Sequence, residues 1–231
     1  MRDSLIGKAP VLSGYELEEA TSVVEVFRAA HSTPLLTARM GLRSCIGTES
    51  VPAVELTQRL KRTPTIVDKL RRLPTMTLSR MQDIGGCRAV FATQDEVNAV
   101  LTRFTRNSED RNETPDTVRD YVTNPRSSGY RAVHVWTRYG GRRIEVQLRT
   151  WFQNNWADMV EDITFDTGID YKNGAGAEIV HDWLRRLAGA PALVEAGMTV
   201  GEALGPDYDA LRDAASARIT EETRQEGGGH A

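Results

Sequence analysis

Two acidic side chains stand where predicted strands meet polar neighbours, and they are the first candidates for chemistry. Asp83 comes directly before the apolar strand expected at 87–92 and is followed, after Ile84, by two glycines. Glu145 lies within a second expected strand, RRIEVQLRT. Two carboxylates on neighbouring strands suffice for Mg²⁺, which binds few protein ligands and takes further oxygens from phosphates. A turn cap at Asp83 and a solvated strand face at Glu145 are the structural alternatives.

The alternation of residues around Glu145 predicts which side chains accompany it. Successive side chains of a strand point to opposite faces, so Glu145, Gln147 and Arg149 share one face. The preceding expected strand places Tyr130, Ala132, His134 and Trp136 together, and Gly140-Gly141 supplies the turn of a hairpin. In register, a phenol ring and an imidazole would then lie beside the carboxylate, a combination that suits a nucleotide site. The exposed face of a surface sheet has the same pattern.

Positive charge is concentrated in the middle of the chain. Residues 59–88 contain eight Arg and Lys against two Asp, whereas residues 150–231 contain six basic and fifteen acidic residues. The overall net charge of -3 hides this asymmetry. Since the chain has neither a P-loop nor a kinase glycine-rich loop, phosphate binding would depend on Arg and Lys side chains. Two solvated helical faces of opposite sign would give the same distribution.

The remaining pattern predicts the elements that position these residues. We expect a helix at 15–30, a loop at 33–52, short helices at 53–62 and 65–72, a helix from Asp95 to about 106, and a surface loop at 107–117. A helix at 151–162 follows the hairpin, and the last fifty residues form helices broken by Pro191, Gly197, Gly201 and Gly205-Pro206. This pattern divides the chain into an N-terminal helical region (1–52), a core (53–172) and a C-terminal helical extension (173–231).

Composition excludes several classes of protein. The chain of 231 residues is 40% hydrophobic and 26% charged, which is typical of a folded globular protein. No apolar run approaches 18 residues, so no membrane-spanning helix is expected. The first residues lack the apolar stretch of a secretory signal, and two cysteines cannot build a disulfide framework, which together indicate a cytoplasmic protein.

Four blocks of this sequence resemble the synthetase domain of the RelA/SpoT family. These are RLKRTPTIVDKL, RMQDIGGCR, DYVTNPRSSGYRAVH and EVQLRTWFQNNWA, which occur in this order between residues 59 and 172. The resemblance implies an α+β fold in which a mixed sheet of about five strands is flanked by helices, as in nucleotidyltransferase-like synthetases. It also implies an enzyme that transfers pyrophosphate from ATP to the 3′-hydroxyl of GDP or GTP, making the alarmone (p)ppGpp and AMP.

The resemblance assigns roles to particular residues. Asp83 resembles the magnesium ligand, and Glu145 the second acidic residue, a ligand or the general base. Around ATP it places Arg59 and Arg88 on the adenine and Lys61 and Lys69 on the phosphates. Around the acceptor it places Tyr130, stacked on the base, together with Arg126, His134, Gln147 and Asn154.

The acceptor side departs from the family pattern. Glu161-Asp162 stands where Glu-His is common, Tyr171-Lys172 arrives late, and Ala132 replaces a serine. A second reading therefore stays open, in which the acceptor is the 3′-terminal adenosine of tRNA and the protein is a toxin neutralised by an antitoxin partner. A third is a catalytically silent nucleotide-binding or interaction module. His181-Asp182 lacks the other ligands of an HD-type hydrolase, and the sequence leaves a homo-oligomer open.

Overall fold

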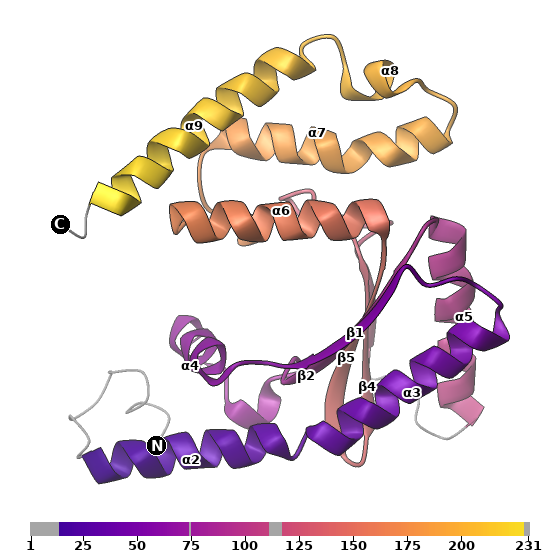
Figure 1. The fold of residues 1–231 in the computed structure, drawn as a ribbon, viewed down its shortest axis with the longest axis vertical. Helices are drawn as coiled ribbons and strands as arrows, with labels where there is room; N and C mark the ends of the chain where they lie inside the picture. The colour runs from indigo at the N-terminus through magenta and orange to yellow at the C-terminus, as the bar shows by residue number, and fades with distance from the viewer. Residues whose placement is uncertain (1–13, 74, 111–116, 229–231) are drawn as a thin grey trace. The chain divides into compact units, whose positions relative to one another are not determined.

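The computed structural model describes residues 14–73, 75–110 and 117–228, and they contain a five-stranded sheet of order β1-β2-β5-β4-β3 (Figure 1). The strands are β1 (Glu55–Leu60), β2 (Gly85–Phe91), β3 (Thr117–Asp120), β4 (Val133–Tyr139) and β5 (Arg142–Thr150). β4 and β5 form the hairpin expected around Gly140-Gly141, which both have positive φ. The predicted α+β class with about five strands is confirmed.

Helices account for most of the remaining described chain. They are α2 (Gly14–Ala29), α3 (Ser32–Thr48), α4 (Thr63–Arg72), α5 (Gln94–Asp110), α6 (Trp151–Thr167), α7 (Glu178–Glu195), α8 (Val200–Leu204) and α9 (Tyr208–Gly228), with short 3₁₀ turns η1 (Leu78–Arg80) and η2 (Tyr171–Asn173). Within the described residues, no helix is long and apolar enough to cross a membrane.

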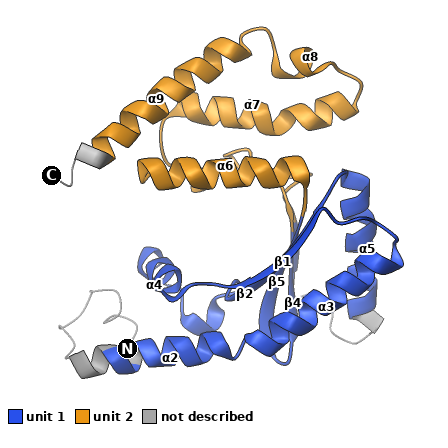
Figure 2. Ribbon diagram, in the orientation of Figure 1, with its two compact units in different colours: residues 1–119, 134–148 blue, residues 120–133, 149–231 orange. Residues whose placement is uncertain are grey.

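The chain divides into two compact units (Figure 2). Unit 1 comprises residues 1–119 and 134–148, and unit 2 comprises residues 120–133 and 149–231. Each unit is therefore built from two separate stretches of sequence. The candidate site residues fall into both units.

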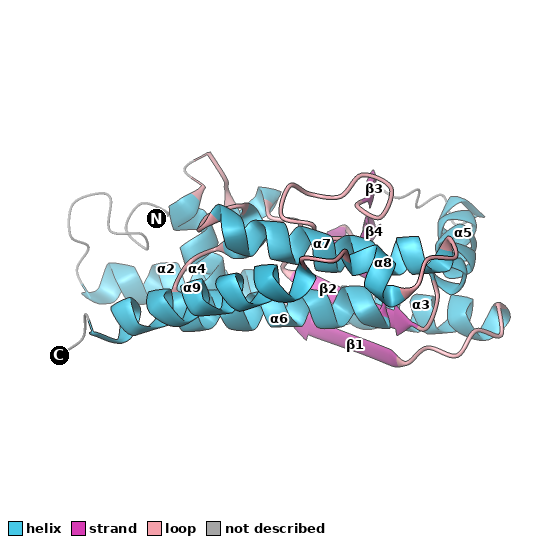
Figure 3. Ribbon diagram, turned by 90° about the horizontal axis from the view of Figure 1, so that it is seen from above, coloured by secondary structure: helices cyan, strands magenta, loops and turns pink. Residues whose placement is uncertain are grey.

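The segment 53–62 forms a strand, which corrects the helix expected there. β1 pairs antiparallel with β2, with Arg59 opposite Gly86 and Thr57 opposite Arg88, and Figure 3 shows the two strands side by side. The helix prediction rested on local pattern, in which Leu56 and Leu60 lie four residues apart. That spacing fits one face of a strand equally well, and the hydrogen bonds to β2 decide the outcome.

The segment predicted as a loop at 33–52 is largely the helix α3. Its buried residues, Leu35, Ala38, Leu42, Cys45 and Ile46, recur at helical spacing. Pro34 lies in the first turn, where a missing N–H costs no intrahelical hydrogen bond. Gly41 provides room for the Tyr139 hydroxyl, which would lie 3.3 Å from an added Cβ.

Three smaller expectations are also corrected. Thr93 caps α5, since its Oγ1 accepts from the Glu96 N–H and the Glu96 carboxylate accepts from the Thr93 N–H, so Asp95 lies in the first turn. α7 continues through Pro191 to Glu195. The expected loop at 107–117 is helical up to Asp110, and its residues 111–116 lie outside the described part of the chain.

Each unit has a hydrophobic cluster that holds its site elements. In unit 1, Val24 of α2, Ile66 and Leu70 of α4, and Met81 and Ile84 before β2 are buried together. In unit 2, one cluster joins helices α6, α7 and α9 to the segment before β4, and includes Tyr130, Trp156, Tyr171, Leu184 and Ala215.

Candidate active site

In unit 1, the carboxylate of Asp83 lies between two lysines. Lys61 Nζ is 2.9 Å from Oδ2, and Lys69 Nζ is 2.8 Å from Oδ1. Burial alone would raise the pKa of Asp83, but the positive charges of Lys61 and Lys69 outweigh it and hold the pKa below its usual range. The two lysines come from different elements, one directly after β1 and the other from α4. They form a cationic pair around an ionised carboxylate.

Two arginines share one face of the sheet beside this pair. Residues directly opposite in an antiparallel ladder point to the same face, so the pairs Arg59–Gly86 and Thr57–Arg88 place both guanidinium groups there. Arg88 also contacts the Glu55 carboxylate at 3.4 Å. Gly86, opposite Arg59, adds no side chain to this face, whereas Thr57, opposite Arg88, does.

Glu145 belongs to the same face of the sheet. Its neighbour Ile144 packs against Gly85 on the opposite face, the face covered by His31 and Leu35 of the α3 segment. Since side chains alternate along a strand, Glu145 points toward the side of Arg59 and Arg88. β5 is next to β2 in the sheet, as expected for two carboxylates on neighbouring strands.

Two side chains orient the Glu145 carboxylate. His134 Nδ1 lies 2.9 Å from Oε1, and Gln147 Nε2 donates to Oε2 at 2.9 Å. Burial alone would raise the pKa of Glu145, which is 9% exposed, but the contacts with His134 and Gln147 lower it below its usual range. The negative charge of Asp83 acts in the opposite direction and raises the pKa of Glu145. Glu145 is thus ionised at neutral pH with both oxygens held in place.

Cys87 does not take part in this chemistry. The thiol points to the covered face of the sheet and is 2% exposed. Burial, with the nearby charge of Glu145, raises its pKa to about 12, so the thiol stays protonated. Cys87 is therefore a small core residue of the sheet.

The donor set of unit 1 fits a magnesium ion carried by phosphates. Among the described residues, no group of three or more His, Cys, Asp or Glu comes together as a metal site. Asp83 and Glu145 provide two carboxylates whose charges interact. Mg²⁺ commonly uses one or two carboxylates and completes its shell with water and substrate phosphates.

In unit 2, Tyr130 is surrounded by cations. The ring is 1% exposed, and three charged groups lie near its centroid: Arg126 Cζ at 5.3 Å, Arg149 Cζ at 5.3 Å and Lys172 Nζ at 5.4 Å. These are distances of cation–π contact. Tyr130 also precedes β4 instead of lying within it, which corrects the expectation that it shares a strand face with His134.

Arg149 is a site residue to which the sequence analysis gave no role. It is 3% exposed, its Nη2 donates to the Tyr130 hydroxyl at 2.8 Å, and its Nη1 donates to Asn154 Oδ1 at 3.5 Å. Asn154 in turn donates to Asp158 at 2.9 Å. The alternation that singled out Glu145 and Gln147 also includes Arg149, and this is the signal that identifies it.

The predicted site residues therefore form two groups. Unit 1 brings together the expected ATP-side and acidic residues, and His134 and Gln147 contact Glu145 there. Unit 2 brings together Arg126, Tyr130 and Asn154 with Arg149 and Lys172. His134 and Gln147, expected around the acceptor, thus act first as partners of the carboxylate.

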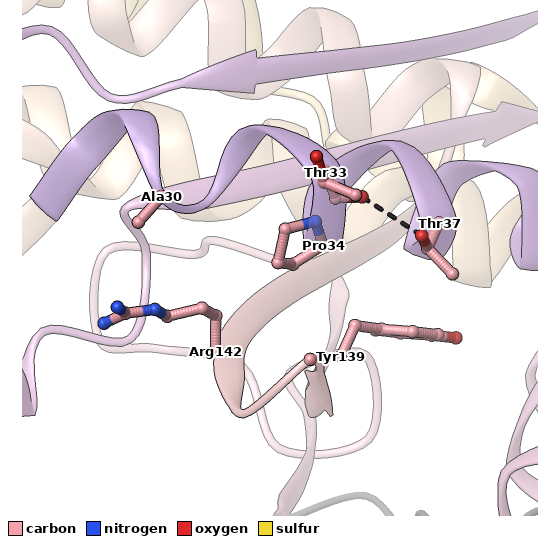
Figure 4. A pocket seen from close by; sticks show the side chains of 7 residues that line it. Ala30, Thr33, Pro34, Thr37, Tyr139 and Arg142 are labelled. Atoms are coloured by element: carbon pink, nitrogen blue, oxygen red, sulfur yellow. Dashed lines mark hydrogen bonds between the residues drawn. The ribbon is translucent and has the colours of Figure 1, made fainter. Parts of the chain in front are cut away.

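A separate cavity in unit 1 contains none of these residues. It has a volume of about 580 Å³ and lies between the start of α3 and the β4–β5 turn (Figure 4). Its lining is Ala30, Thr33, Pro34, Thr37, Tyr139, Gly140 and Arg142. Thr37 Oγ1 donates to the Thr33 carbonyl, so this hydroxyl is already engaged within α3. The cavity is not part of the candidate active site.

The fold and the unit 1 site define a helix-flanked nucleotidyltransferase-like sheet with a carboxylate pair and basic side chains on one face. The family model described as "Region found in RelA / SpoT proteins" matches residues 58–175, just over half of the chain. The chain belongs to this family.

Curated relatives agree with this assignment. An uncharacterized protein of Mycobacterium tuberculosis is 33% identical over 154 residues, which cover 64% of this chain and 55% of the relative. The GTP pyrophosphokinase YjbM of Bacillus subtilis is 30% identical over 125 residues, covering 49% of this chain and 57% of that protein. The chain thus spans little more than half the length of these relatives.

Solved structures share the fold. Small alarmone synthetase 1 from Bacillus subtilis superposes with a TM-score of 0.59 at 24% identity, covering 74% of this chain and 92% of that chain. A GTP pyrophosphokinase family protein from Streptococcus pneumoniae gives a TM-score of 0.60 at 21% identity, covering 85% and 96%. At these identities the likeness concerns the fold alone.

Proposed function

We propose that this protein transfers the β,γ-pyrophosphate of ATP to the 3′-hydroxyl of GDP or GTP, forming (p)ppGpp and AMP. The observation that supports it best is Asp83 held between Lys61 and Lys69, at the edge of a sheet face that also carries Glu145. Membership of a family whose relatives include GTP pyrophosphokinases supports the same reaction.

The cationic face of unit 1 is suited to the donor. Lys61 and Lys69 exchange their contacts with Asp83 for the ATP phosphates and offset the charge of the transferring group. Arg59 and Arg88 take the two sides of the adenine, because a planar guanidinium stacks where an ammonium cannot. Gly86, directly opposite Arg59 in the ladder, adds no side chain to this surface.

Glu145 is suited to receive the proton of the acceptor. The 3′-oxygen forms a bond to the β-phosphorus of ATP. The bond between the β-phosphorus and the oxygen that bridges it to the α-phosphorus breaks, and AMP leaves with that oxygen. The hydroxyl proton passes to the Glu145 carboxylate, which Gln147 and His134 hold in one orientation. Positioning of this kind supplies much of the rate in phosphoryl transfer.

Magnesium fits the reaction as a cofactor. Asp83 and Glu145 would hold it, and when bound it would offset the negative charge of the phosphates. The residues Lys61 and Lys69 are then free to bind the phosphate chain.

The cations of unit 2 are suited to an acceptor nucleotide. Arg126 and Lys172 lie on the ring of Tyr130, so an acceptor base that stacks there takes the place of a cation. The displaced guanidinium or ammonium is then free to pair with the acceptor phosphates.

The reaction is tested with ATP labelled on its γ-phosphate, Mg²⁺ and a single acceptor in each reaction: GDP, GTP or deacylated tRNA. We expect a labelled guanosine product and AMP in equal amounts. Release of ADP would indicate transfer of one phosphate and contradict the proposal. Label on tRNA alone would identify the toxin reading instead, and no label with any acceptor would identify a silent nucleotide-binding module.

A matched pair of variants separates the site from the protein as a whole. Asp83→Asn removes the carboxylate between the lysines, whereas Asp68→Asn removes one on α4 that is paired with Arg72 at 3.1 Å and is 55% exposed. Transfer should be lost in the first variant and kept in the second.

A further inference from the structure

The 3₁₀ turn η2 lies between the acceptor group of unit 2 and the C-terminal helix α9. Its three residues, Tyr171, Lys172 and Asn173, face two ways: Tyr171 is fully buried against α9, while Lys172 and Asn173 reach Tyr130 and Arg126. The function proposed above gives no task to α9. Its contact with η2 is therefore the feature that calls for an explanation.

A single buried carboxylate ties η2 to α9. Glu222 is 4% exposed and accepts a short hydrogen bond from the Tyr171 hydroxyl. Arg218, one helical turn earlier, donates to the other oxygen of Glu222 at 2.8 Å. Burial and the contact with Glu222 raise the pKa of Tyr171 to about 12, so its hydroxyl remains a donor.

The ring of Tyr171 is closely packed by its neighbours. A Cβ at Gly176 would lie 2.4 Å from the ring, and His181 packs at 5.4 Å between centroids. Gly176 has φ +100°, so both its backbone and this close approach require glycine. The packing therefore fixes the position of Tyr171. Because Lys172 and Asn173 follow it in the same turn, their backbone is fixed as well.

The next two residues bring polar groups to the acceptor side. Lys172 lies 5.4 Å from the Tyr130 ring centroid, pairs with Glu161 at 2.6 Å, and its carbonyl accepts from Ser128 at 3.0 Å. Asn173 Oδ1 accepts from Arg126 at 3.4 Å. η2 is thus joined to the segment that carries Tyr130 through Arg126, Ser128 and the Tyr130 ring.

We infer that Glu222 is a positioning residue which, through the Tyr171 hydroxyl, fixes Lys172 and Asn173 beside Tyr130 and Arg126 and so sets the affinity for the acceptor. This rests on the proposed function, in which Tyr130 and its cations bind the acceptor nucleotide. The late Tyr171-Lys172 pair, which departs from the family pattern, is then fixed by a helix from the C-terminal extension.

The test uses variants of the full chain. Tyr171→Phe removes the hydroxyl and keeps the packed ring, Glu222→Ala removes its acceptor, and Glu222→Gln retains an oxygen that the hydroxyl can use. Glu221→Ala is the matched control, because Glu221 also pairs with Arg218, at 2.9 Å, but its side chain is 58% exposed and it is not the residue that accepts from the Tyr171 hydroxyl.

We expect Tyr171→Phe and Glu222→Ala to raise the acceptor KM about three- to ten-fold, the value of one buried hydrogen bond, with the ATP KM unchanged. Glu222→Gln should recover most of the affinity, and Glu221→Ala should match the wild type. The double variant should be no worse than Glu222→Ala alone, since Glu222→Ala has already removed the contact between the carboxylate and the Tyr171 hydroxyl. Equal changes in both KM values, or a fall in Tm alone, would overturn the inference.

Hydrogen exchange provides a readout that does not need activity. Amides of residues 126–130 and 171–177 should exchange faster in Tyr171→Phe than in the wild type or Glu221→Ala. Unchanged exchange in both segments would overturn the coupling. If the wild type transfers no label to any acceptor, the proposed function fails, and the exchange measurement still decides whether Glu222 and Tyr171 fix the segment around Tyr130.

Discussion

At the scale of single residues, Asp83 combines two properties that a packing residue would not need. Its side chain is 21% exposed, and both oxygens contact lysines from different elements. Asparagine keeps the size of this side chain but loses the charge that would hold a metal and orient both lysines. We expect Asp83→Asn to lower kcat/KM about 100-fold or more, since metal and charge stabilisation are worth several kcal/mol. Steady-state kinetics beside a melting curve measures this, and near-normal turnover at an unchanged Tm would contradict the role.

Tyr130 is the residue at which the structure changes a sequence-based expectation most. Stacking on an acceptor base alone would leave Tyr130→Phe neutral. The hydroxyl, however, accepts from the buried Arg149 guanidinium at 2.8 Å, so phenylalanine strips that charge of an acceptor and should cost about 1–3 kcal/mol of unfolding free energy. Tyr130→Ala adds a cavity beside Trp156 and should cost about 3–5 kcal/mol. Urea unfolding of both variants tests this, and a Phe variant as stable as the wild type would show that Arg149 does not need the hydroxyl.

Residue types and spacing singled out Asp83 and Glu145 as candidates, and the resemblance added Lys61 and Lys69, which contact Asp83 in the structure. The hairpin pattern also predicted the His134 imidazole beside the Glu145 carboxylate, and the structure shows that contact. The pattern could not indicate that Lys172 lies on the Tyr130 ring, nor that Tyr130 precedes β4. Both are set by packing between segments far apart in the sequence.

At the scale of elements, the helices and strands that were predicted correctly are those whose signals lie within one short stretch of sequence. The β4–β5 hairpin was predicted because alternation and two glycines lie within one stretch, and the helix expected after it at 151–162 is α6, which Thr150 caps in the structure. The helix expected at 53–62 was wrong. Leu56 and Leu60 fit a helix or a strand, and the hydrogen bonds between β1 and β2 decide between the two. The loop expected at 33–52 was wrong because Pro34 and two glycines were interpreted as loop residues. A proline in the first turn and a glycine at a close packing contact both fit the helix α3.

Helix α2 has a measurable effect on the site in unit 1. Arg28 Nε donates to the backbone carbonyl of Lys61 at 2.8 Å, just where β1 leads into α4. Arg28→Gln removes this bond and loosens the backbone that carries Lys61. We expect the ATP KM to rise about three- to ten-fold while the acceptor KM is unchanged. Arg72→Gln, which breaks an exposed pair with Asp68 on α4, is the control, and an equal effect in both would show that loss of charge is responsible.

At the scale of the whole molecule, the two units share one covalent chain that passes between them three times, at 119–120, 133–134 and 148–149. The expected division at 52 and 172 was based on a linear order of regions. Each unit, however, needs a segment from the other side of these crossings: Tyr130 of the inserted segment packs in the same cluster as Trp156 and Leu184. Folding of unit 2 therefore requires residues 120–133 as well as residues 149–231.

Two ionised site carboxylates contribute to the acid sensitivity of the protein. Asp83 and Glu145 have ordinary pKa values of 3.8 and 4.5, and both are lower in the folded state. A carboxyl that binds its proton more weakly when folded stabilises the fold above its unfolded pKa, and this contribution is lost as the pH falls through the folded pKa. The free energy of unfolding should therefore be steady near neutral pH and decline below about pH 4.5, as the carboxylates take up protons.

Asp83→Asn and Glu145→Gln should each flatten the decline, because an amide has no proton to gain. Urea unfolding at a series of pH values from 7 to 3, followed by tryptophan fluorescence, measures the slopes. Variant curves that fall in parallel with the wild type below pH 4.5 would show that these two carboxylates do not carry the effect.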